Sequence, residues 1–258
     1  MPTLKLTLAY DGAAFVGWQR QAHGVSIQGV LETILGELDV VPVAVAGAGR
    51  TDAGVHALGQ VASCVLATER DSETVQRVLN AKLPGRVRVL AVEEVPEAFH
   101  ARFSARAKRY RYVIANGPLV SPFAAGQAWQ VPGPLDAEAM QQAAAGLVGT
   151  HDFSAFQSSG TEVPHAVRTI HEATVSDLTD DPPVPLPAQA VPGGRLLAFE
   201  VAADGFLRHM VRAIAGTLVE VGQGRRPTDL MPLLASADRA QAGPTAPPHG
   251  LWLVEVNY

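Results

Sequence analysis

The spacing of apolar residues along the first part of the chain predicts alternating strands and helices. Leu4, Leu6, Leu8 and Tyr10 alternate with polar or small residues, which is typical of a strand with one buried face. Further strands are expected over residues 41–46, 61–66 and 87–91. Helices are expected after Ser26 and after Ser72, because each serine can cap the helix that follows it. This order predicts an α/β domain over residues 1–104.

The second part of the chain repeats this coarse order without a clear sequence repeat. Strands are expected around Tyr110–Ile114, near residues 170–175, over 195–203 and over 251–258. Helices are expected after Asp136, over 206–221, which is the longest apolar helix, and after Thr228, which can cap a short one. We therefore predict a second α/β domain over residues 105–258.

One loop, residues 47–56, departs from the pattern of buried strands. Gly47, Gly49 and Gly54 let the backbone turn sharply and let a bulky ligand approach it closely. Between these glycines, Arg50 and Asp52 supply a cation and a carboxylate directly after an apolar run. We expect chemistry at this loop.

Three interpretations of the loop compete. It could be a surface turn with incidental charges, or a dinucleotide fingerprint that begins at Gly47. The fingerprint is a weak interpretation because Asp52 stands at the third glycine position, where a carboxylate would repel the pyrophosphate. In the third interpretation Asp52 is a nucleophile, and Arg50 keeps it ionised and grips a phosphate or a base.

Composition narrows the class of protein. Of 258 residues, 47% are apolar and 17% are charged, which is typical of a soluble globular protein. We find neither an apolar run long enough to span a bilayer nor a signal segment, and the single cysteine, Cys64, allows no internal disulfide. These features predict a cytoplasmic protein with a packed strand thiol, and the scattered histidines do not suggest a zinc site.

The net charge of −5 argues mildly against nucleic acid, but its distribution argues for it. A basic stretch without an acid contains Arg102, Arg106, Lys108, Arg109 and Arg111, interleaved with Phe103 and Tyr110. Residues 177–194 are rich in Pro and Asp, so we expect a solvated loop there. A local basic groove is therefore compatible with the acidic total.

Several motifs together resemble the TruA family, the tRNA pseudouridine synthases that modify uridines 38, 39 and 40 of the anticodon stem-loop. The motifs are Gly49-Arg50-Thr51-Asp52-Ala53-Gly54-Val55-His56, Tyr10-Asp11-Gly12, Gly17-Trp18-Gln19-Arg20-Gln21, Phe99-His100-Ala101-Arg102-Phe103-Ser104, Arg109-Tyr110-Arg111-Tyr112 and His209-Met210-Val211-Arg212. The resemblance covers nearly the whole chain, and the first motif is highly specific.

The resemblance implies roles for particular residues. Asp52 matches the nucleophile, Arg50 the arginine that helps to flip the base and pairs with the aspartate, and Tyr110 the ring that stacks on the target uracil. Leu251 matches an apolar wall of the pocket. Further substrate contacts are expected from Arg20, Arg109 and Arg111, although Arg20 could also serve only to brace its loop.

The resemblance also implies a fold and an assembly. The fold is α/β, of the α+β type: two similar domains, each with an antiparallel or mixed sheet flanked by helices. Two chains would form a homodimer whose cleft holds tRNA, with no cofactor and no metal. The loop at 177–194 is not part of the family's core pattern.

Two other functions stay open at this point. A non-catalytic module that binds structured RNA would use Asp52 only to cap the turn, but it has no use for a carboxylate in a basic groove. A glycoside or nucleoside hydrolase would need a second carboxylate as general acid, and none is evident near Asp52.

Overall fold

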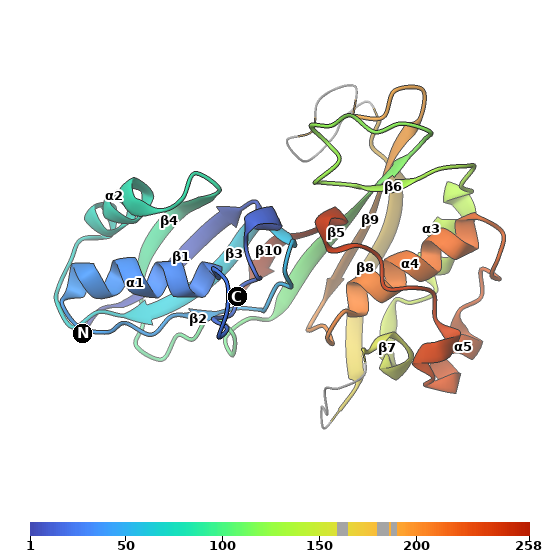
Figure 1. Ribbon diagram of the computed structural model, residues 1–258. Coiled ribbons are helices and arrows are strands. Elements are labelled where there is room, and N and C mark those ends of the chain that lie inside the picture. Colours follow the sequence, from blue (N-terminus) through green and yellow to red (C-terminus); the bar gives the residue numbers. More distant parts are fainter. Residues whose placement is uncertain (159–164, 180–185, 187–189) are drawn as a thin grey trace. The chain divides into compact units, whose positions relative to one another are not determined.

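The computed structural model describes residues 1–158, 165–179, 186 and 190–258, which form two compact units (Figure 1). Unit 1 comprises Met1–Arg106 and Leu253–Tyr258, and unit 2 comprises Ala107–Trp252. The sequence predicts a first domain over 1–104 and a second over 105–258, whereas the packing groups Leu253–Tyr258 with unit 1.

Unit 1 is a sheet with two helices. Its elements are β1 (Thr3–Tyr10), α1 (Ile27–Asp39), β2 (Ala46–Gly47), β3 (His56–Val65), α2 (Ser72–Lys82), β4 (Val87–Val95) and, from Leu253 onward, β10 (Leu251–Asn257). The strand order is β4-β1-β3-β10, with β2 beside β3. β1 pairs antiparallel with both neighbours, so that Leu6 lies opposite Ala62 on β3 and Val92 on β4. The expected alternation of buried residues along β1 is confirmed, since Leu4, Leu6 and Leu8 are all at most 1% exposed.

Unit 2 contains the remaining strands and, among its described residues, three α-helices. Its elements are β5 (Ala107–Asn116), β6 (Trp129–Val131), α3 (Ala137–Ala145), β7 (Gly149–Asp152), β8 (Val167–Asp177), β9 (Arg195–Ala203), α4 (Met210–Gly222) and α5 (Met231–Ser236). The order is β5-β9-β8-β7, antiparallel throughout, and β6 runs parallel to β5. The predicted α/β class, with an antiparallel or mixed sheet flanked by helices, is confirmed.

The strand expected over residues 41–46 is wrong in extent. Only Ala46 and Gly47 form β2, because the backbone of Val45 is bound by side chains of α1 instead of a neighbouring strand. The Gln28 amide donates to the Val45 carbonyl, and the Val45 amide donates to Glu32. Helix side chains thus replace the hydrogen bonds that a ladder would supply.

Three helix starts also differ from expectation. α2 is capped by Asp71, whose carboxylate accepts from the amide of Thr74, so that Ser72 is the first helical residue. α4 begins at Met210, not at residue 206, because His209 adopts the left-handed conformation, with φ 62°. α5 is preceded by Asp229, which accepts from the amide of Met231, where the sequence predicts Thr228 as the cap.

The loop expected over residues 177–194 is described only in part. Before it, β7 ends at Asp152 and a short 3-10 helix covers Ser154–Phe156. Of the stretch 177–194, Asp177 ends β8, and residues 180–185 and 187–189 lie outside the described residues. The expectation of a solvated loop there is therefore untested.

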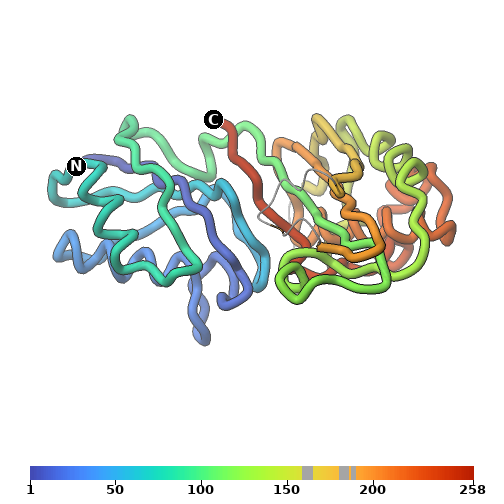
Figure 2. The backbone as a smooth tube through the Cα atoms, turned by 90° about the horizontal axis from the view of Figure 1, so that it is seen from above, coloured from blue at the N-terminus to red at the C-terminus, as the bar shows by residue number. Residues whose placement is uncertain are grey.

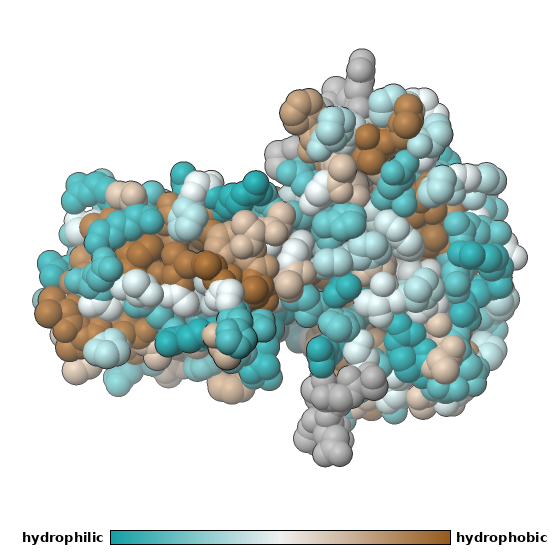
Figure 3. Space-filling model, in the orientation of Figure 1, coloured by the Kyte–Doolittle hydropathy of each residue, from teal (hydrophilic) through white to brown (hydrophobic). Residues whose placement is uncertain are grey.

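Residues Leu253–Tyr258 belong to unit 1, where β10 is the neighbour of β3 in the strand order (Figures 1 and 2). On the face seen in Figure 3, apolar residues reach the surface of unit 1 among polar ones. Val25 and Val40, which flank α1, are 55% and 83% exposed. Within the described ranges, no helix is long and apolar enough to cross a membrane.

Candidate active site

The glycine-rich loop of unit 1 is held by a threonine that points inward. Thr51 is 6% exposed, and its hydroxyl lies 2.9 Å from the hydroxyl of Tyr10. Gln60, which is fully buried, donates to the Tyr10 hydroxyl at 3.3 Å and to the Gly49 carbonyl at 2.9 Å. With Thr51 fixed inward, its neighbours are displayed outward: Arg50 is exposed and Asp52 is partly exposed.

The backbone turns tightly directly after Asp52. The Val55 amide donates to the Asp52 carbonyl at 3.1 Å, and Gly54 has φ 79°, which is the value that a type II turn requires at its third residue. Gly12 lies against this turn so closely that a Cβ there would be 2.0 Å from the Val55 carbonyl oxygen. Asp52, which is partly exposed, therefore lies on a turn whose backbone is packed against Gly12.

Trp18 supports the loop from the other side. Its amide donates to the Thr51 carbonyl at 3.0 Å, and its ring occupies the space that a Cβ on Gly47 would need, at 2.4 Å. Trp18 is only 3% exposed. These contacts indicate that Trp18 braces the loop.

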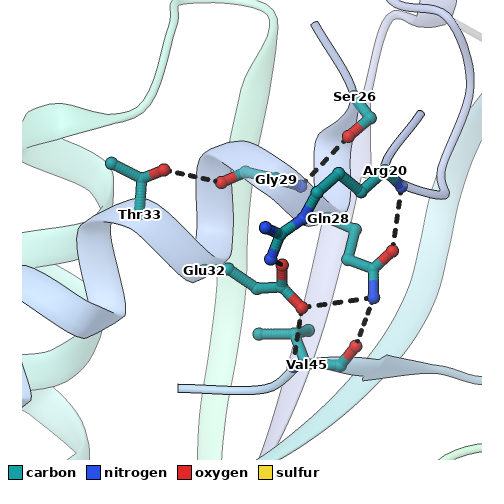
Figure 4. A network of polar contacts seen from close by, with 7 residues as sticks. All are labelled: Arg20, Ser26, Gln28, Gly29, Glu32, Thr33 and Val45. Atoms are coloured by element: carbon teal, nitrogen blue, oxygen red, sulfur yellow. Dashed lines mark hydrogen bonds and ion pairs between the residues drawn. The ribbon is translucent and has the colours of Figure 1, made fainter. Parts of the chain in front are cut away.

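After Trp18, residues 19–21 are polar and exposed, and Figure 4 shows the contacts of Arg20. The Arg20 side chain is 68% exposed and forms an ion pair with Glu32, which is 10% exposed. The Arg20 amide donates to Gln28, which donates to Glu32 at 3.2 Å and to the Val45 carbonyl at 2.9 Å. This network joins Arg20, α1 and the segment that leads into the glycine-rich loop.

Two titratable residues under the loop serve as structural anchors. Burial raises the pKa of Tyr10 to about 12, against the lowering effect of its hydrogen bonds to Thr51 and Gln60, so its phenol stays protonated. His56 is fully buried, and its Nδ1 lies 3.2 Å from the Gly12 amide and 3.2 Å from a carboxylate oxygen of Asp11.

In unit 2, Tyr110 lies on β5 with its ring largely enclosed. It is 7% exposed, and Phe206 meets it edge-on with ring centroids 5.0 Å apart. A ring enclosed in this way is compatible both with a core tyrosine and with one that stacks on a base.

The two arginines beside Tyr110 pair with carboxylates of neighbouring strands. Arg111 donates to Glu200 on β9 at 2.6 Å, and the register places these two residues directly opposite each other. Arg109 donates to Glu172 on β8 at 2.8 Å and lies 3.7 Å from Glu200. The basic stretch is therefore partly neutralised by strand pairing, and a phosphate would compete with these carboxylates.

Leu251 is 6% exposed and follows a short 3-10 helix, Pro248–Gly250, that packs on Tyr112. The Tyr112 hydroxyl donates to the Pro247 carbonyl at 2.8 Å, and a Cβ on Gly250 would lie 2.7 Å from the Tyr112 ring. Arg212 of α4 donates to the Ala246 carbonyl at 2.7 Å in the same region. The pKa of His249 is lowered, chiefly by burial and to a smaller extent by Arg212, although a backbone hydrogen bond to Ala128 acts in the opposite direction.

The structure thus groups the proposed residues by unit. Arg20, Arg50 and Asp52 belong to unit 1, and Tyr110, Arg109, Arg111 and Leu251 belong to unit 2. Residues that sequence reasoning missed are those that hold the loop, chiefly Gln60, Gln28 and Glu32. The i, i+4 spacing of Gln28 and Glu32 on a helix whose neighbouring positions are apolar was the available signal.

Cys64 is a packed strand thiol, as predicted. It is 4% exposed on β3, and burial together with the charge of Asp39 raises its pKa to about 12. In the described part of the chain, no group of three or more His, Cys, Asp or Glu side chains could hold a metal ion.

The class defined by the fold is a two-unit α/β protein whose first unit displays a carboxylate on a braced glycine-rich loop. The family model described as tRNA pseudouridine synthase matches residues 7–104 and 143–258. The chain belongs to this family, which is a family of isomerases.

Named relatives match over the full length. The chain is 48% identical to tRNA pseudouridine synthase A of Myxococcus xanthus, with 100% of this chain and 92% of that protein covered. It is 44% identical to the protein of the same name from Brevibacillus brevis, with 100% of both covered. A crystal structure of an unknown protein from Galdieria sulphuraria covers 86% of this chain and 92% of that one, at 14% identity and a TM-score of 0.25, which is too low to inform the fold.

Proposed function

We propose that the protein isomerises uridine to pseudouridine at positions 38, 39 and 40 of the tRNA anticodon stem-loop, with Asp52 as the nucleophile. The observation that carries this proposal is the loop of unit 1, in which Thr51 is buried and fixed to Tyr10 while the adjacent Asp52 is partly exposed on a hydrogen-bonded turn. Membership of the tRNA pseudouridine synthase family supports tRNA as the substrate.

The reaction needs a nucleophile and a site that retains the free base. The carboxylate of Asp52 attacks C1′ of the ribose or C6 of the base, and the N1–C1′ bond breaks. The uracil then turns and C5 bonds to C1′. The bond from Asp52 to C1′ or C6 breaks and frees the carboxylate, the C5 proton leaves to solvent and N1 takes up a proton. Atoms balance without an oxidant or a reductant, so a carboxylate is chemically sufficient for the covalent step.

The target base must leave the stack, which costs a few kcal/mol. We assign Arg50 to base flipping and to pairing with Asp52, which its exposure on the same loop permits. We assign Tyr110 to stacking on the uracil and Leu251 to the apolar wall beside it. Stacking on an aromatic ring is worth about 1–3 kcal/mol per base, enough to offset much of the flipping cost.

The remaining contacts concern the tRNA backbone. We assign Arg20, which is 68% exposed, to a phosphate, while Arg109 and Arg111 contribute through their position beside Tyr110. We further propose a homodimer that acts in the cytoplasm, where its substrate is processed. The oligomeric state is measured by sedimentation at concentrations that span the assay range.

The decisive experiment is tritium release from tRNA transcripts labelled at C5 of uridine. We expect release by the wild type and a loss of about a thousandfold or more in Asp52→Asn, with tRNA binding kept, because the substitution removes only the nucleophile. Transcripts without uridine at 38–40 should release no tritium. Equal loss of binding and turnover in Asp52→Asn would contradict the nucleophile role, and release from the transcripts without uridine at 38–40 would contradict the site assignment.

A further inference from the structure

An aromatic ring of unit 1 stands in solvent on a loop that is otherwise firmly built. Phe103 lies between β4 and β5 and is 77% exposed. Leaving a phenyl ring in water forgoes the stabilisation that burial would give it, so such a ring on an ordered loop is informative. Its backbone is fixed by hydrogen bonds within the turn His100–Ser104.

The turn is closed in both directions. The Ser104 amide donates to the His100 carbonyl at 2.9 Å, and the His100 amide donates to the Ser104 hydroxyl at 3.0 Å. Nδ1 of His100 accepts from the amides of Arg102 and Phe103, at 3.1 Å and 3.3 Å. The imidazole also lies 4.4 Å from the Phe103 ring, so the ring is held in one place.

The turn is fastened to the sheet beneath the catalytic loop. Ala101 is fully buried; its amide donates to the Ser63 hydroxyl at 3.1 Å, and its carbonyl accepts from the Tyr258 hydroxyl at 2.8 Å. Ala101 packs with Val61 and Ala48, and Ala48 directly precedes Gly49 and Arg50 of the catalytic loop. Phe103 and Asp52 are thus carried by neighbouring parts of one packed unit.

The charge around the ring favours a polyanion. The Arg102 guanidinium lies 5.6 Å from the centroid of the Phe103 ring, and both Arg102 and Arg106 are exposed. The sequence has no acid between Phe99 and Lys108, and the nearest one before this stretch is Glu97. An exposed ring beside guanidinium groups is the combination with which proteins bind unpaired nucleotides, through base stacking and phosphate contacts.

We propose that Phe103 and Arg102 form a second RNA contact outside the reacting site, with Phe103 stacking on an unpaired base of the substrate and Arg102 binding the adjacent phosphate. This inference rests on the proposed function, because it takes the RNA substrate from it. The fixed turn means that little conformational entropy is lost on binding, which favours affinity.

The test compares the dissociation constants of unmodified tRNA for wild type, Phe103→Ala, Phe103→Tyr and Arg102→Gln over a range of salt concentrations. We expect Phe103→Ala to weaken binding about 5-fold to 150-fold without changing the salt dependence, because stacking releases no counterions. Phe103→Tyr should restore affinity. Arg102→Gln should lower the slope of log Kd against log salt by about 0.7 to 0.9, the value for one phosphate contact.

A matched control is Phe123→Ala, which removes an exposed ring of unit 2 that is 80% exposed, and which should leave tRNA affinity unchanged. Unchanged affinity in Phe103→Ala would overturn the proposal. So would weaker binding that accompanies a change in oligomeric state by sedimentation, since a second copy of the chain would then occupy the surface. Tritium release by the wild type separates the two failures: its absence counts against the proposed function, whatever Phe103 does.

Discussion

Single residues determine which side chains of the glycine-rich loop are exposed. The sequence indicates Arg50 and Asp52 by their types and spacing, and the structure adds that the intervening Thr51 is the one turned inward. The partners of Thr51 come from distant positions, Tyr10 and Gln60. Pattern analysis could assign each of them to a strand, but it could not place their side chains together, since this depends on strand register.

Asp39 offers a test of stability at the residue scale. It is 3% exposed, and its carboxylate accepts from the amides of Ala67 and Thr68 and from the Thr68 hydroxyl. Burial raises the pKa of Asp39, but its hydrogen bonds together lower the pKa by more than burial raises it, so the net pKa lies below 3.8. A carboxylate with a depressed folded pKa stabilises the fold above its unfolded pKa and loses this contribution as the pH falls through the folded value.

We therefore expect Asp39→Asn to lower the free energy of unfolding by about 1–3 kcal/mol at pH 7, since the amide cannot accept all three hydrogen bonds. The difference in the free energy of unfolding between variant and wild type should become smaller as the pH falls below 3.8. Urea unfolding at several pH values measures this. Glu69→Gln, an exposed acid nearby, serves as the control, and a gap that stays constant down to the acid transition would refute the linkage.

At the scale of elements, local signals predicted most strands and helices, and long-range contacts explain the misses. Ser26 caps α1 as expected, and residues 195–203 form β9 with the predicted bounds. The strand over 41–46 fails because α1 side chains satisfy the backbone of Val45. The partners of Arg109 and Arg111 escaped prediction for a similar reason, because only the pairing of β5, β8 and β9 brings Glu172 and Glu200 beside them.

The network of α1 can be tested by an isosteric change. Glu32→Gln keeps the shape but puts an amide where Glu32 accepts from Val45 and Gln28 and pairs with Arg20. We expect a loss of about 1–3 kcal/mol in the free energy of unfolding, because Glu32 is largely buried. Chemical denaturation measures it.

Glu37→Gln on the same helix is the matched control. Glu37 is 56% exposed and pairs with Lys82 at the surface, so its replacement should change stability by less than about 1 kcal/mol. Equal effects of the two substitutions would show that the Glu32 network is no more than a surface ion pair.

At the scale of the whole molecule, the two-part organisation follows from the order of predicted elements, but its exact composition does not. Nothing in the pattern of the last strand says which half it joins. The structure groups Leu253–Tyr258 with unit 1, where the Tyr258 hydroxyl donates to the Ala101 carbonyl and the Phe99 and Tyr258 rings lie 4.9 Å apart.

Tyr258→Phe tests the packing of the C-terminal residues on unit 1. It removes one buried hydrogen bond, and we expect a local cost of about 0.5–1.5 kcal/mol. Hydrogen exchange should speed up around Ala101 and β3, while β8 and β9 in unit 2 keep their protection. Equal acceleration in both units would contradict the assignment of this strand to unit 1.

The position of the C-terminal strand also has a consequence for the order in which the units are completed during synthesis. Ala48, at the base of the catalytic loop, packs in a cluster that includes Val256 and Tyr258. A ribosome delivers these residues only after it has synthesised the whole of unit 2. The unit that carries the proposed nucleophile is therefore the first to be translated, but the packing at the base of its glycine-rich loop is incomplete until the residues after unit 2 have been synthesised.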